Sequence, residues 1–292
     1  MSEPIIAQRE VTRHILKRFG IRTQKKLGQH FLVDESVVNR IASALELEPG
    51  APVLEIGPGI GTLTQALAMT GAQVTAVELD RRFIGILDIT LKAYPNVRVV
   101  QGDVLSLNIP EIMGAGPFHI AGNLPYYITT PIVMKILEER VPADRMVFMV
   151  QKEVADRMVS GPGTKDYGAL SVAVQYFTEA SKLFEVPAAS FMPPPAVESA
   201  VILCRMRKGP PVEVPSEKLF FRIVRAAFGQ RRKTLANSLR GCGFAGVAVA
   251  AMLKETGIDG TRRGETLFME EFAMLSRAYY GLEQEGNADA KQ

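Results

Sequence analysis

Short apolar runs alternate with amphipathic stretches from residue 53 onward, and this alternation extends over most of the chain. Such runs predict strands, and the periodic stretches between them predict helices. Strands that alternate with helices are typical of a mostly parallel sheet with helices packed on it. We therefore expect an α/β fold. The predicted strands are 53–56, 74–77, 97–101, 119–122, 146–150 and 197–206, and the clearest predicted helices are 62–69 and 82–93.

The pattern changes after the strand that ends at residue 206. Residues 208–215 form a linker rich in proline, and a helical remainder follows from Ser216, which is placed to cap the first helix. The tail from Glu283 is polar, and we expect it to be disordered. The sequence thus predicts a first domain over residues 1–207 with a basic N-terminal segment, a small all-α domain over 208–282, and a disordered tail over 283–292.

Composition excludes several classes of protein. The chain has 292 residues, of which 47% are hydrophobic and 22% charged, and no window offers the roughly 20 uncharged apolar residues of a membrane span. The N-terminus lacks the apolar region of a secretory signal, so we expect a cytoplasmic protein. The two cysteines and three histidines are scattered, so we expect no metal site.

The segment VLEIGPGIGTLT, residues 53–64, places three glycines between a predicted strand and a predicted helix. Gly57, Gly59 and Gly61 let the backbone pass close to a ligand that any Cβ would displace. Their GxGxG spacing differs from the nicotinamide fingerprint, whose third glycine would stand at Thr62. The turn therefore favours another nucleoside cofactor.

Two further strand ends carry carboxylates. Glu78 ends the second strand, at a spacing suited to a carboxylate that accepts hydrogen bonds from both hydroxyls of a ribose. Asp103 follows the third strand, where it can accept from an adenine amine. Three consecutive strand ends thus supply the groups that an adenosyl ligand needs.

The segment AGNLPYY, residues 121–127, ends the fourth strand and points to amine chemistry. An exocyclic adenine amine is a poor nucleophile because its lone pair is delocalised into the ring. If the Asn123 side-chain oxygen and the backbone carbonyl of Leu124 or Pro125 each accept one N6 hydrogen, the lone pair is turned toward an incoming methyl group, which is a positioning effect. Tyr126 offers a flat face on which an extruded base can stack.

These motifs resemble known families. The glycine turn with its two carboxylates resembles the S-adenosylmethionine site of class I methyltransferases, which implies that Gly57, Gly59, Glu78 and Asp103 contact this cofactor. The NLPY motif resembles that of amino methyltransferases and, with leucine in second place, is closest to the KsgA/RsmA family. The resemblance, which spans roughly residues 23–272, implies a seven-stranded, Rossmann-like class I methyltransferase fold.

Two more segments carry the resemblance. Residues 25–41, KKLGQHFLVDESVVNRI, look like the family's N-terminal segment that closes over the cofactor. This likeness implies cofactor contacts by Gln29, His30 and Leu32, besides Asn123, although many members have asparagine where His30 stands. Residues 191–201, FMPPPAVESAV, are also similar, and the likeness places Phe191 against the target adenine, opposite Tyr126.

Basic residues gather in two places, although the formal net charge is only +3. Such runs make phosphate contacts, which give affinity with little sequence information. One run lies at the N-terminus, with seven Lys and Arg residues between positions 9 and 26. We expect this run, which flanks the cofactor loop, and a second run in the helical domain to bind RNA. The candidate residues of the second run are Arg225, Arg231, Arg232, Lys233 and Arg240.

The resemblance implies transfer of two methyl groups to the N6 amines of each of two adjacent adenosines near the 3′ end of small-subunit (16S) ribosomal RNA. The partner would be an assembling 30S particle, and we expect a monomer. Three alternatives remain open at this point. They are an Erm-type methyltransferase of large-subunit RNA, a non-catalytic assembly factor on the same fold, and a DNA adenine methyltransferase, for which the basic region looks small.

Overall fold

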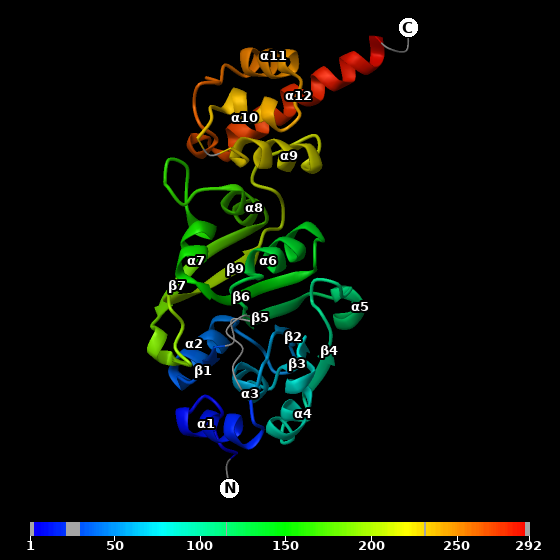
Figure 1. Cartoon of the computed structure of the whole chain (residues 1–292). Coiled ribbons are helices and arrows are strands. Elements are labelled where there is room, and N and C mark those ends of the chain that lie inside the picture. The colour runs from blue at the N-terminus through cyan, green and yellow to red at the C-terminus, as the bar shows by residue number, and fades with distance from the viewer. Residues whose placement is uncertain (1–2, 22–29, 115, 231, 290–292) are drawn as a thin grey trace. The chain divides into compact units, whose positions relative to one another are not determined.

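The computed structural model describes residues 3–21, 30–114, 116–230 and 232–289 (Figure 1). A seven-stranded sheet in the order β4-β3-β2-β5-β6-β9-β7 confirms the expected Rossmann-like fold. Its strands are β2 (Pro52–Ile56), β3 (Gln73–Glu78), β4 (Val97–Gln101), β5 (Phe118–Asn123), β6 (Ala143–Gln151), β7 (Thr178–Val186) and β9 (Ser199–Met206). The pairs from β4 through β6 are parallel, and β9 runs antiparallel to β6.

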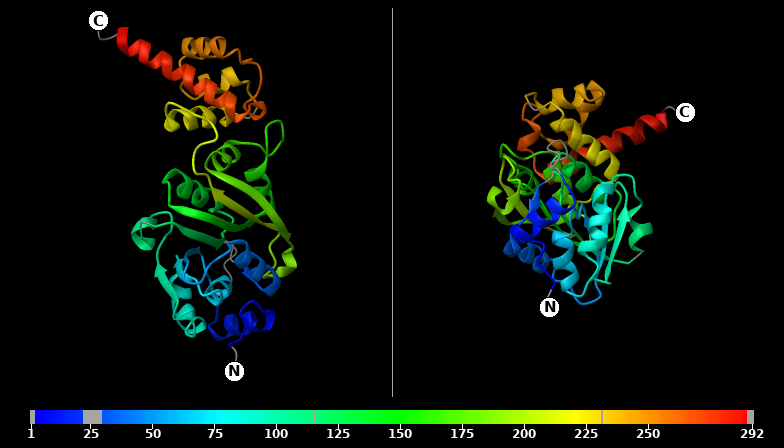
Figure 2. Two further views of the ribbon diagram at one scale, coloured as in Figure 1. Left: turned by 180° about the vertical axis from the view of Figure 1, so that it is seen from behind. Right: turned by 60° about the horizontal axis from the view of Figure 1, so that its bottom comes forward.

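Helices cover the sheet on both sides (Figure 2). The helices joined to these strands are α2 (Glu35–Ala44), α3 (Thr62–Met69), α4 (Arg81–Thr90), α5 (Ile109–Met113) and α6 (Thr129–Glu138). On one face, buried Leu63 and Leu67 of α3 and Ile41 of α2 pack on strand residues such as Val53 and Val147. These residues form one apolar core of the domain.

The order in which strands are added to the sheet reverses between β2 and β5, and this switch point positions the site. From β2 the chain builds β3 and β4 on one side, and it then returns to place β5 against the opposite edge of β2. Ligands of doubly wound folds bind outside the carboxyl ends of the strands at such a switch point. At this point β2 leads into Gly57 and β5 ends at Asn123.

Strand β7 is absent from the predicted strands because its sequence, TEASKLFEV, lacks regular alternation. It lies at the edge of the sheet beyond β9 and buries only its two end residues, Thr178 and Val186. Exposed charged residues are common on edge strands, where they prevent pairing with another chain. An edge strand of this kind gives little hydrophobic signal in the sequence.

The N-terminal helix α1 (Arg9–Arg18) docks on α3 and α4. Its buried Ile15 belongs to a cluster with Phe83, Ile86 and Leu87 of α4. Gln65 of α3 fixes the preceding segment, because its side-chain oxygen accepts from the Ile6 amide at 2.8 Å and its side-chain nitrogen donates to the Pro4 carbonyl at 3.0 Å. The segment before the family-like motifs is therefore part of the folded domain.

By their internal contacts, residues 156–178 group with 207–292 as a second compact unit, whereas the other residues form the first. The second unit contains α8 (Ala169–Phe177), α9 (Glu217–Phe228), α10 (Leu235–Gly241), α11 (Gly246–Thr256) and α12 (Met269–Asp289), with η3 (Gly264–Thr266) before α12. The rings of Tyr176 and Phe177 in α8 pack with those of Phe220 and Phe221 in α9, mostly edge to face, with centroids 5.0–5.4 Å apart. These aromatic contacts explain why residues 156–178, which the sequence assigned to the first domain, group with the C-terminal helices.

Two details of the C-terminal unit bear on the sequence predictions. Ser216 caps α9 as expected, since its hydroxyl accepts from the Leu219 amide at 3.2 Å. Helix α12 continues to Asp289, past Glu283, where the sequence predicted disorder. Extending an existing helix needs no new nucleation, and the Glu, Gln and Ala residues of this stretch are good helix formers.

Neither a membrane span nor a metal cluster is found in the described part of the chain. None of its helices has the length and apolarity that a bilayer span requires. Within residues 3–21, 30–114, 116–230 and 232–289, no three His, Cys, Asp or Glu side chains converge as metal ligands do.

Candidate active site

A cavity of about 390 Å³ opens at the switch point and is lined by both of the segments that the sequence singled out. From the glycine turn and the strand ends, Gly57, Gly59, Glu78 and Asp103 line it. From the NLPY segment, Asn123, Leu124, Pro125 and Tyr126 line it. His30 and Leu32 close one side, whereas Gln29 lies outside the described residues. The glycine turn and the target-amine motif therefore face one common space.

The glycine turn has a backbone that favours glycine. Gly57, Gly59 and Gly61 all have positive φ angles, of 72°, 59° and 92°. A Cβ on Gly57 would stand 4.0 Å from the Pro125 ring, and one on Gly59 would stand 3.6 Å from the Phe31 ring. Side chains at these positions would be strained and would point toward other residues that line the cavity, so the turn keeps this space open.

The Glu78 carboxylate is held by backbone donors at the cavity wall. Its Oε2 accepts from the Gly59 amide at 3.0 Å and its Oε1 accepts from the Asp80 amide at 2.8 Å. Burial raises the pKa of Glu78, and the amide donors oppose that rise. Asp103 caps the turn after β4, since its Oδ1 accepts from the Leu105 amide at 2.9 Å. Both carboxylates are thus oriented before any ligand binds.

Glu55 is a third carboxylate at the cavity, and the sequence predicted no role for it. It is 1% exposed, and its Oε2 has no hydrogen-bond partner among the described residues. The Thr62 hydroxyl, on the cavity wall as well, is also buried without a partner. Burial raises the pKa of Glu55 to about 8, and the charge of Glu78 adds to the rise. Unsatisfied polar groups in a cavity wall are available to a polar ligand.

The two carbonyls of the NLPY segment that the sequence left open differ in their hydrogen-bond partners. The Pro125 carbonyl is engaged, because it accepts from the Ile128 amide and the Thr129 hydroxyl, each at 3.1 Å. The Leu124 amide is also engaged, donating to the Met149 carbonyl at 3.0 Å. Among the described residues no donor is bonded to the Leu124 carbonyl. Of the two carbonyls that the sequence left open, the geometry therefore favours that of Leu124.

Asn123 and Tyr126 are both oriented by partners that the sequence did not identify. The Asn123 amide nitrogen donates to the His30 carbonyl at 3.3 Å, which leaves its oxygen as an acceptor. The Tyr126 hydroxyl is 2.6 Å from the Ser199 hydroxyl, and burial raises the pKa of this phenol. Ser199 belongs to the FMPPPAVESAV segment, so this motif acts on the site through its serine.

Phe191 does not reach the cavity, in contrast to its expected place opposite Tyr126. It is 0% exposed and belongs to the core cluster with Leu32, Val37 and Ile41. It sits in the short strand β8 (Phe191–Met192), which pairs antiparallel with β1 (Phe31–Leu32), and this pairing holds its ring in the core. The ring that stacks on Tyr126 in this structure is instead His30.

The basic run of the second unit is exposed to solvent. Arg225 lies on α9 and Arg240 on α10, while Arg232 and Lys233 lie in the turn between these helices, and all four are exposed. Arg231 falls outside the described residues. These side chains are therefore accessible to a ligand in solution.

The fold and the cavity together define the class of protein. A doubly wound sheet with β9 antiparallel to β6, a glycine turn after its central strand and an NLPY segment at the neighbouring strand end make this chain a class I methyltransferase with an amine-directed motif. Comparison with known proteins agrees. The family model "Ribosomal RNA adenine dimethylase" matches residues 20–279. The chain belongs to the ribosomal RNA adenine dimethylase family, whose members use S-adenosylmethionine.

Individual relatives refine this assignment. Ribosomal RNA small subunit methyltransferase A of Geobacillus sp. (strain WCH70) is 49% identical, over 91% of this chain and 95% of the relative. The protein of the same name from Clostridioides difficile (strain 630) is 46% identical, over 93% and 96%. Among solved structures, the 23S rRNA methyltransferase ErmE is 31% identical, with a TM-score of 0.65 over 86% of this chain and 99% of that one. A dimethyladenosine transferase from Plasmodium falciparum shares the fold at 24% identity, with a TM-score of 0.73 over 88% and 98%.

Proposed function

We propose that this protein dimethylates the N6 amines of two adjacent adenosines near the 3′ end of small-subunit (16S) ribosomal RNA. One observation carries the proposal: the glycine turn and the NLPY segment line the same cavity of about 390 Å³. A bound cofactor and an extruded base can therefore meet in one enclosed space. The relatives named as small-subunit methyltransferases support the choice of RNA.

The cofactor would be held by the residues of the first three strand ends. The open backbone at Gly57 and Gly59 and the oriented carboxylates of Glu78 and Asp103 fit a ligand that carries a ribose and an adenine amine. The partnerless Glu55 oxygen is a further polar group in the cavity wall. When bound, S-adenosylmethionine supplies an electrophilic methyl group. Leu32 would contribute backbone contacts on the near side of the cavity.

Asn123 and Leu124 would prepare the adenine amine. The free oxygen of the Asn123 amide and the Leu124 carbonyl can each accept one N6 hydrogen, which directs the nitrogen lone pair out of the plane of the base. Tyr126, whose hydroxyl is fixed by Ser199, would hold the extruded base by stacking. Each transfer replaces one N6 hydrogen, which leaves as a proton to water.

The exposed residues Arg225, Arg232, Lys233 and Arg240, together with Arg231, would hold the RNA by its phosphates. Such contacts weaken steeply with salt and carry no sequence information. Neutralising Arg232 and Lys233 to Gln should weaken RNA binding and leave cofactor affinity unchanged. An equal loss of both would point to misfolding instead.

The main alternative is methylation of large-subunit RNA. Identity to the 23S methyltransferase ErmE is 31%, against 46–49% for the two small-subunit relatives, and this difference favours the small subunit. Methyl transfer should be assayed on immature small and large subunits in parallel. Transfer to small subunits alone is expected, and transfer to large subunits alone would overturn the proposal.

A non-catalytic assembly factor is the alternative from another class. The Asn123→Ala variant should lose methyl transfer while it still binds cofactor and RNA, because one of the two acceptors for the amine is gone. Asn39→Ala, the same substitution at an exposed position of α2 outside the cavity lining, serves as the matched control. Methylation that persists in Asn123→Ala would remove Asn123 from the site.

The cellular setting follows from the substrate. We propose that the protein acts as a monomer on an assembling 30S particle in the cytoplasm. Mass spectrometry of ribosomal RNA from cells without the protein should show the loss of dimethyladenosine.

A further inference from the structure

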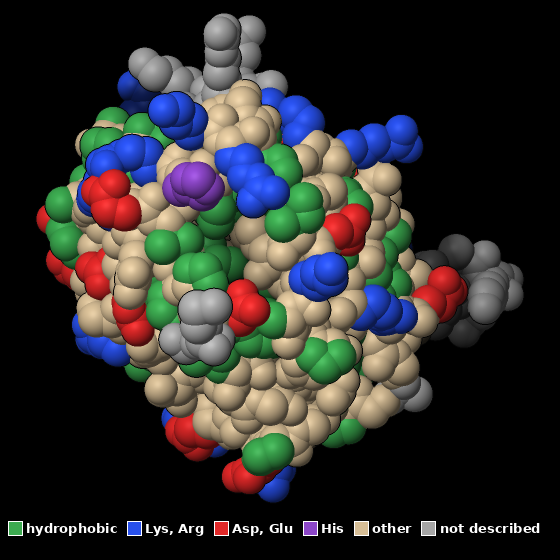
Figure 3. Space-filling model, turned by 90° about the horizontal axis from the view of Figure 1, so that it is seen from below, with side chains coloured by type: hydrophobic (Ala, Val, Ile, Leu, Met, Phe, Trp, Pro, Cys, Tyr) green, Lys and Arg blue, Asp and Glu red, His purple; other side chains and the backbone are tan. Residues whose placement is uncertain are grey.

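The exposed face of α1 carries a stripe of positive charge that the methyl-transfer site does not explain. Arg9, Arg13 and Lys17 are spaced by four residues, so they lie on one side of the helix, and Arg18 adjoins them. All four are exposed. With Glu10 the helix has a net charge of +3, which equals the formal net charge of the whole chain. Figure 3 views the molecule from the side where α1 lies, and Lys and Arg side chains gather on one part of that face.

Helix stability accounts for only part of this charge. Lys17 and Arg18 stand in the last turn, where cations interact favourably with the helix dipole. Arg9 stands at the opposite end, where a positive charge is unfavourable. Arg13 pairs with Glu10 at 2.5 Å, but both side chains are more than half exposed, and such pairs contribute about 0–1 kcal/mol. Neither the helix dipole nor the Glu10 pair therefore accounts for the whole stripe.

The stripe is fixed close to the methyl-transfer cavity. Ile15, on the buried face of α1, clusters with Phe31 and Phe83, and both phenylalanines line the cavity. Arg9 reaches the segment that leads into β8, since its guanidinium donates to the Ala189 carbonyl at 2.5 Å. Helix α1 is about 15 Å long at 1.5 Å per residue, so the stripe covers about that length on the same compact unit as the cavity.

The stripe also lies outside the part of the chain that the family model matches, which begins at residue 20. The match therefore assigns nothing to α1. The buried face of the helix argues against a membrane surface as its partner. An interfacial helix needs an exposed apolar face, but Thr12 and Ile15 are buried against the domain.

We propose that the exposed face of α1 binds phosphates of the RNA strand that flanks the extruded adenosine. The proposal rests on the proposed function, because it takes the methylated RNA as the ligand. Phosphate contacts position a nucleic acid without reading its sequence. A basic stripe beside the cavity, in the same compact unit, would fix the approach of the strand to the NLPY segment. The basic run of the C-terminal helices would then be a second, separate contact.

The test removes the charge without changing the helix. The triple variant Arg13→Gln, Lys17→Gln, Arg18→Gln keeps residues of good helix propensity at exposed positions. Its affinity for the RNA substrate should fall, and the slope of log affinity against log salt should decrease by about 2, as expected for three lost phosphate contacts. The charge-preserving variant Arg13→Lys, Lys17→Arg, Arg18→Lys should keep the affinity and the slope of the wild type.

Three results decide between the possibilities. If the Gln triple variant keeps the salt slope of the wild type, and the wild type methylates ribosomal RNA, the role of α1 is overturned and the proposed function stands. The RNA contact of α1 is also overturned if the Gln triple variant loses binding to anionic phospholipid vesicles while its RNA binding is unchanged. A wild type that methylates no ribosomal RNA in the same assay rejects the proposed function itself. Cofactor affinity and the thermal midpoint should match the wild type in both triple variants.

Discussion

The imidazole of His30 stacks on the ring of Tyr126, with centroids 5.9 Å apart and planes inclined by 25°. The Nδ1 atom of the same imidazole is 2.8 Å from the carbonyl oxygen of Pro193. A carbonyl can only accept, so Nδ1 carries the hydrogen, and in the neutral ring Nε2 has the lone pair. His30 thereby links the segment that precedes β1, the proline loop after β8 and the tyrosine of the NLPY motif.

Loss of this ring should lower methyl transfer. An aromatic pair contributes about 0.5–1.5 kcal/mol beyond burial, so His30→Ala should reduce kcat/KM roughly 2- to 10-fold through a less well positioned Tyr126. His30→Phe restores a flat ring at this place and should recover most of the activity. Calorimetric titration with S-adenosylmethionine provides the decisive comparison. If the affinity for the cofactor falls as much as kcat/KM, the imidazole contacts the cofactor instead of supporting the tyrosine.

The sequence predicted the central sheet well because buried parallel strands give continuous apolar runs. The strand expected at 97–101 and the helix expected at 62–69 have those bounds in the structure, and the cavity lies at the end of the strands that carry Gly57, Glu78 and Asn123. Edge strand β7 was missed, because its mixed pattern of exposed residues gives no period. Local pattern thus finds strands that are rich in apolar residues, including the edge strand β4 (VRVVQ), and fails at β7 (TEASKLFEV), where polar and charged residues interrupt the apolar ones.

Several contacts within the site could not be predicted from the sequence either. The backbone acceptor at Leu124 became distinguishable from Pro125 only through the bonds that the Pro125 carbonyl receives from Ile128 and Thr129. The stack of His30 on Tyr126 joins residues 96 positions apart in the chain. The resemblance placed Phe191 against the target adenine, but the pairing of β1 with β8 buries this residue in the core. Such relationships depend on tertiary packing, which a linear pattern does not contain.

Glu55 should make stability depend on pH in an unusual direction. Its pKa of about 8 in the folded state lies above the ordinary value of 4.5, because burial disfavours the carboxylate. The contribution of Glu55 to the free energy of unfolding is fully present below about pH 4.5 and decreases as the pH rises toward 8. The reason is that Glu55 ionises at a lower pH in the unfolded chain than in the folded protein. The Glu55→Gln variant cannot ionise and should lack this decrease. Thermal midpoints of both proteins between pH 5 and 8.5 provide the measurement, and parallel curves would show that Glu55 is ionised throughout.

Gly122 should tolerate no side chain. A Cβ at this position would lie 2.9 Å from the Ile56 carbonyl oxygen and 2.8 Å from a Leu124 methyl group, because β2 and β5 approach closely beside the cavity. Overpacking of this kind costs about 1–3 kcal/mol, so Gly122→Ala should lower the midpoint of urea denaturation and displace Leu124.

The Gly85→Ala variant is the matched control for Gly122→Ala. Gly85 lies on α4 with nothing within 4 Å of its Cβ position, and alanine there should stabilise the helix by about 0.5–1 kcal/mol. Equal effects of the two changes would contradict the steric account.

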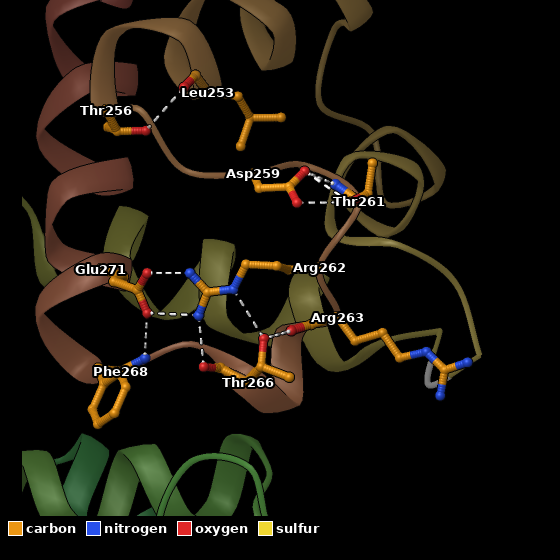
Figure 4. A network of polar contacts seen from close by, with 9 residues as sticks. All are labelled: Leu253, Thr256, Asp259, Thr261, Arg262, Arg263, Thr266, Phe268 and Glu271. Atoms are coloured by element: carbon orange, nitrogen blue, oxygen red, sulfur yellow. Dashed lines mark hydrogen bonds and ion pairs between the residues drawn. The ribbon is translucent and has the colours of Figure 1, made fainter.

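Arg262 should be the most sensitive polar residue of the C-terminal unit (Figure 4). Its guanidinium forms an ion pair with Glu271 of α12, donates to the Thr266 carbonyl at 2.7 Å, and reaches the Thr266 hydroxyl at 3.2 Å. The Glu271 carboxylate also accepts from the Phe268 amide at 2.8 Å, so one pair fixes both the loop and the start of the helix. Burial tends to raise the pKa of Glu271, but the bonds from Arg262 and Phe268 hold it below its ordinary value.

The Arg262→Ala variant leaves the partly buried Glu271 carboxylate and Thr266 carbonyl without this donor, and this should cost about 1–3 kcal/mol of stability. Neighbouring Arg263, which is more exposed and 3.9 Å from Glu265, is the control, and Arg263→Ala should change the midpoint of denaturation little. The two midpoints, measured by circular dichroism in urea, test this contrast, and an equally stable Arg262→Ala variant would show that the network adds nothing to the fold of these helices.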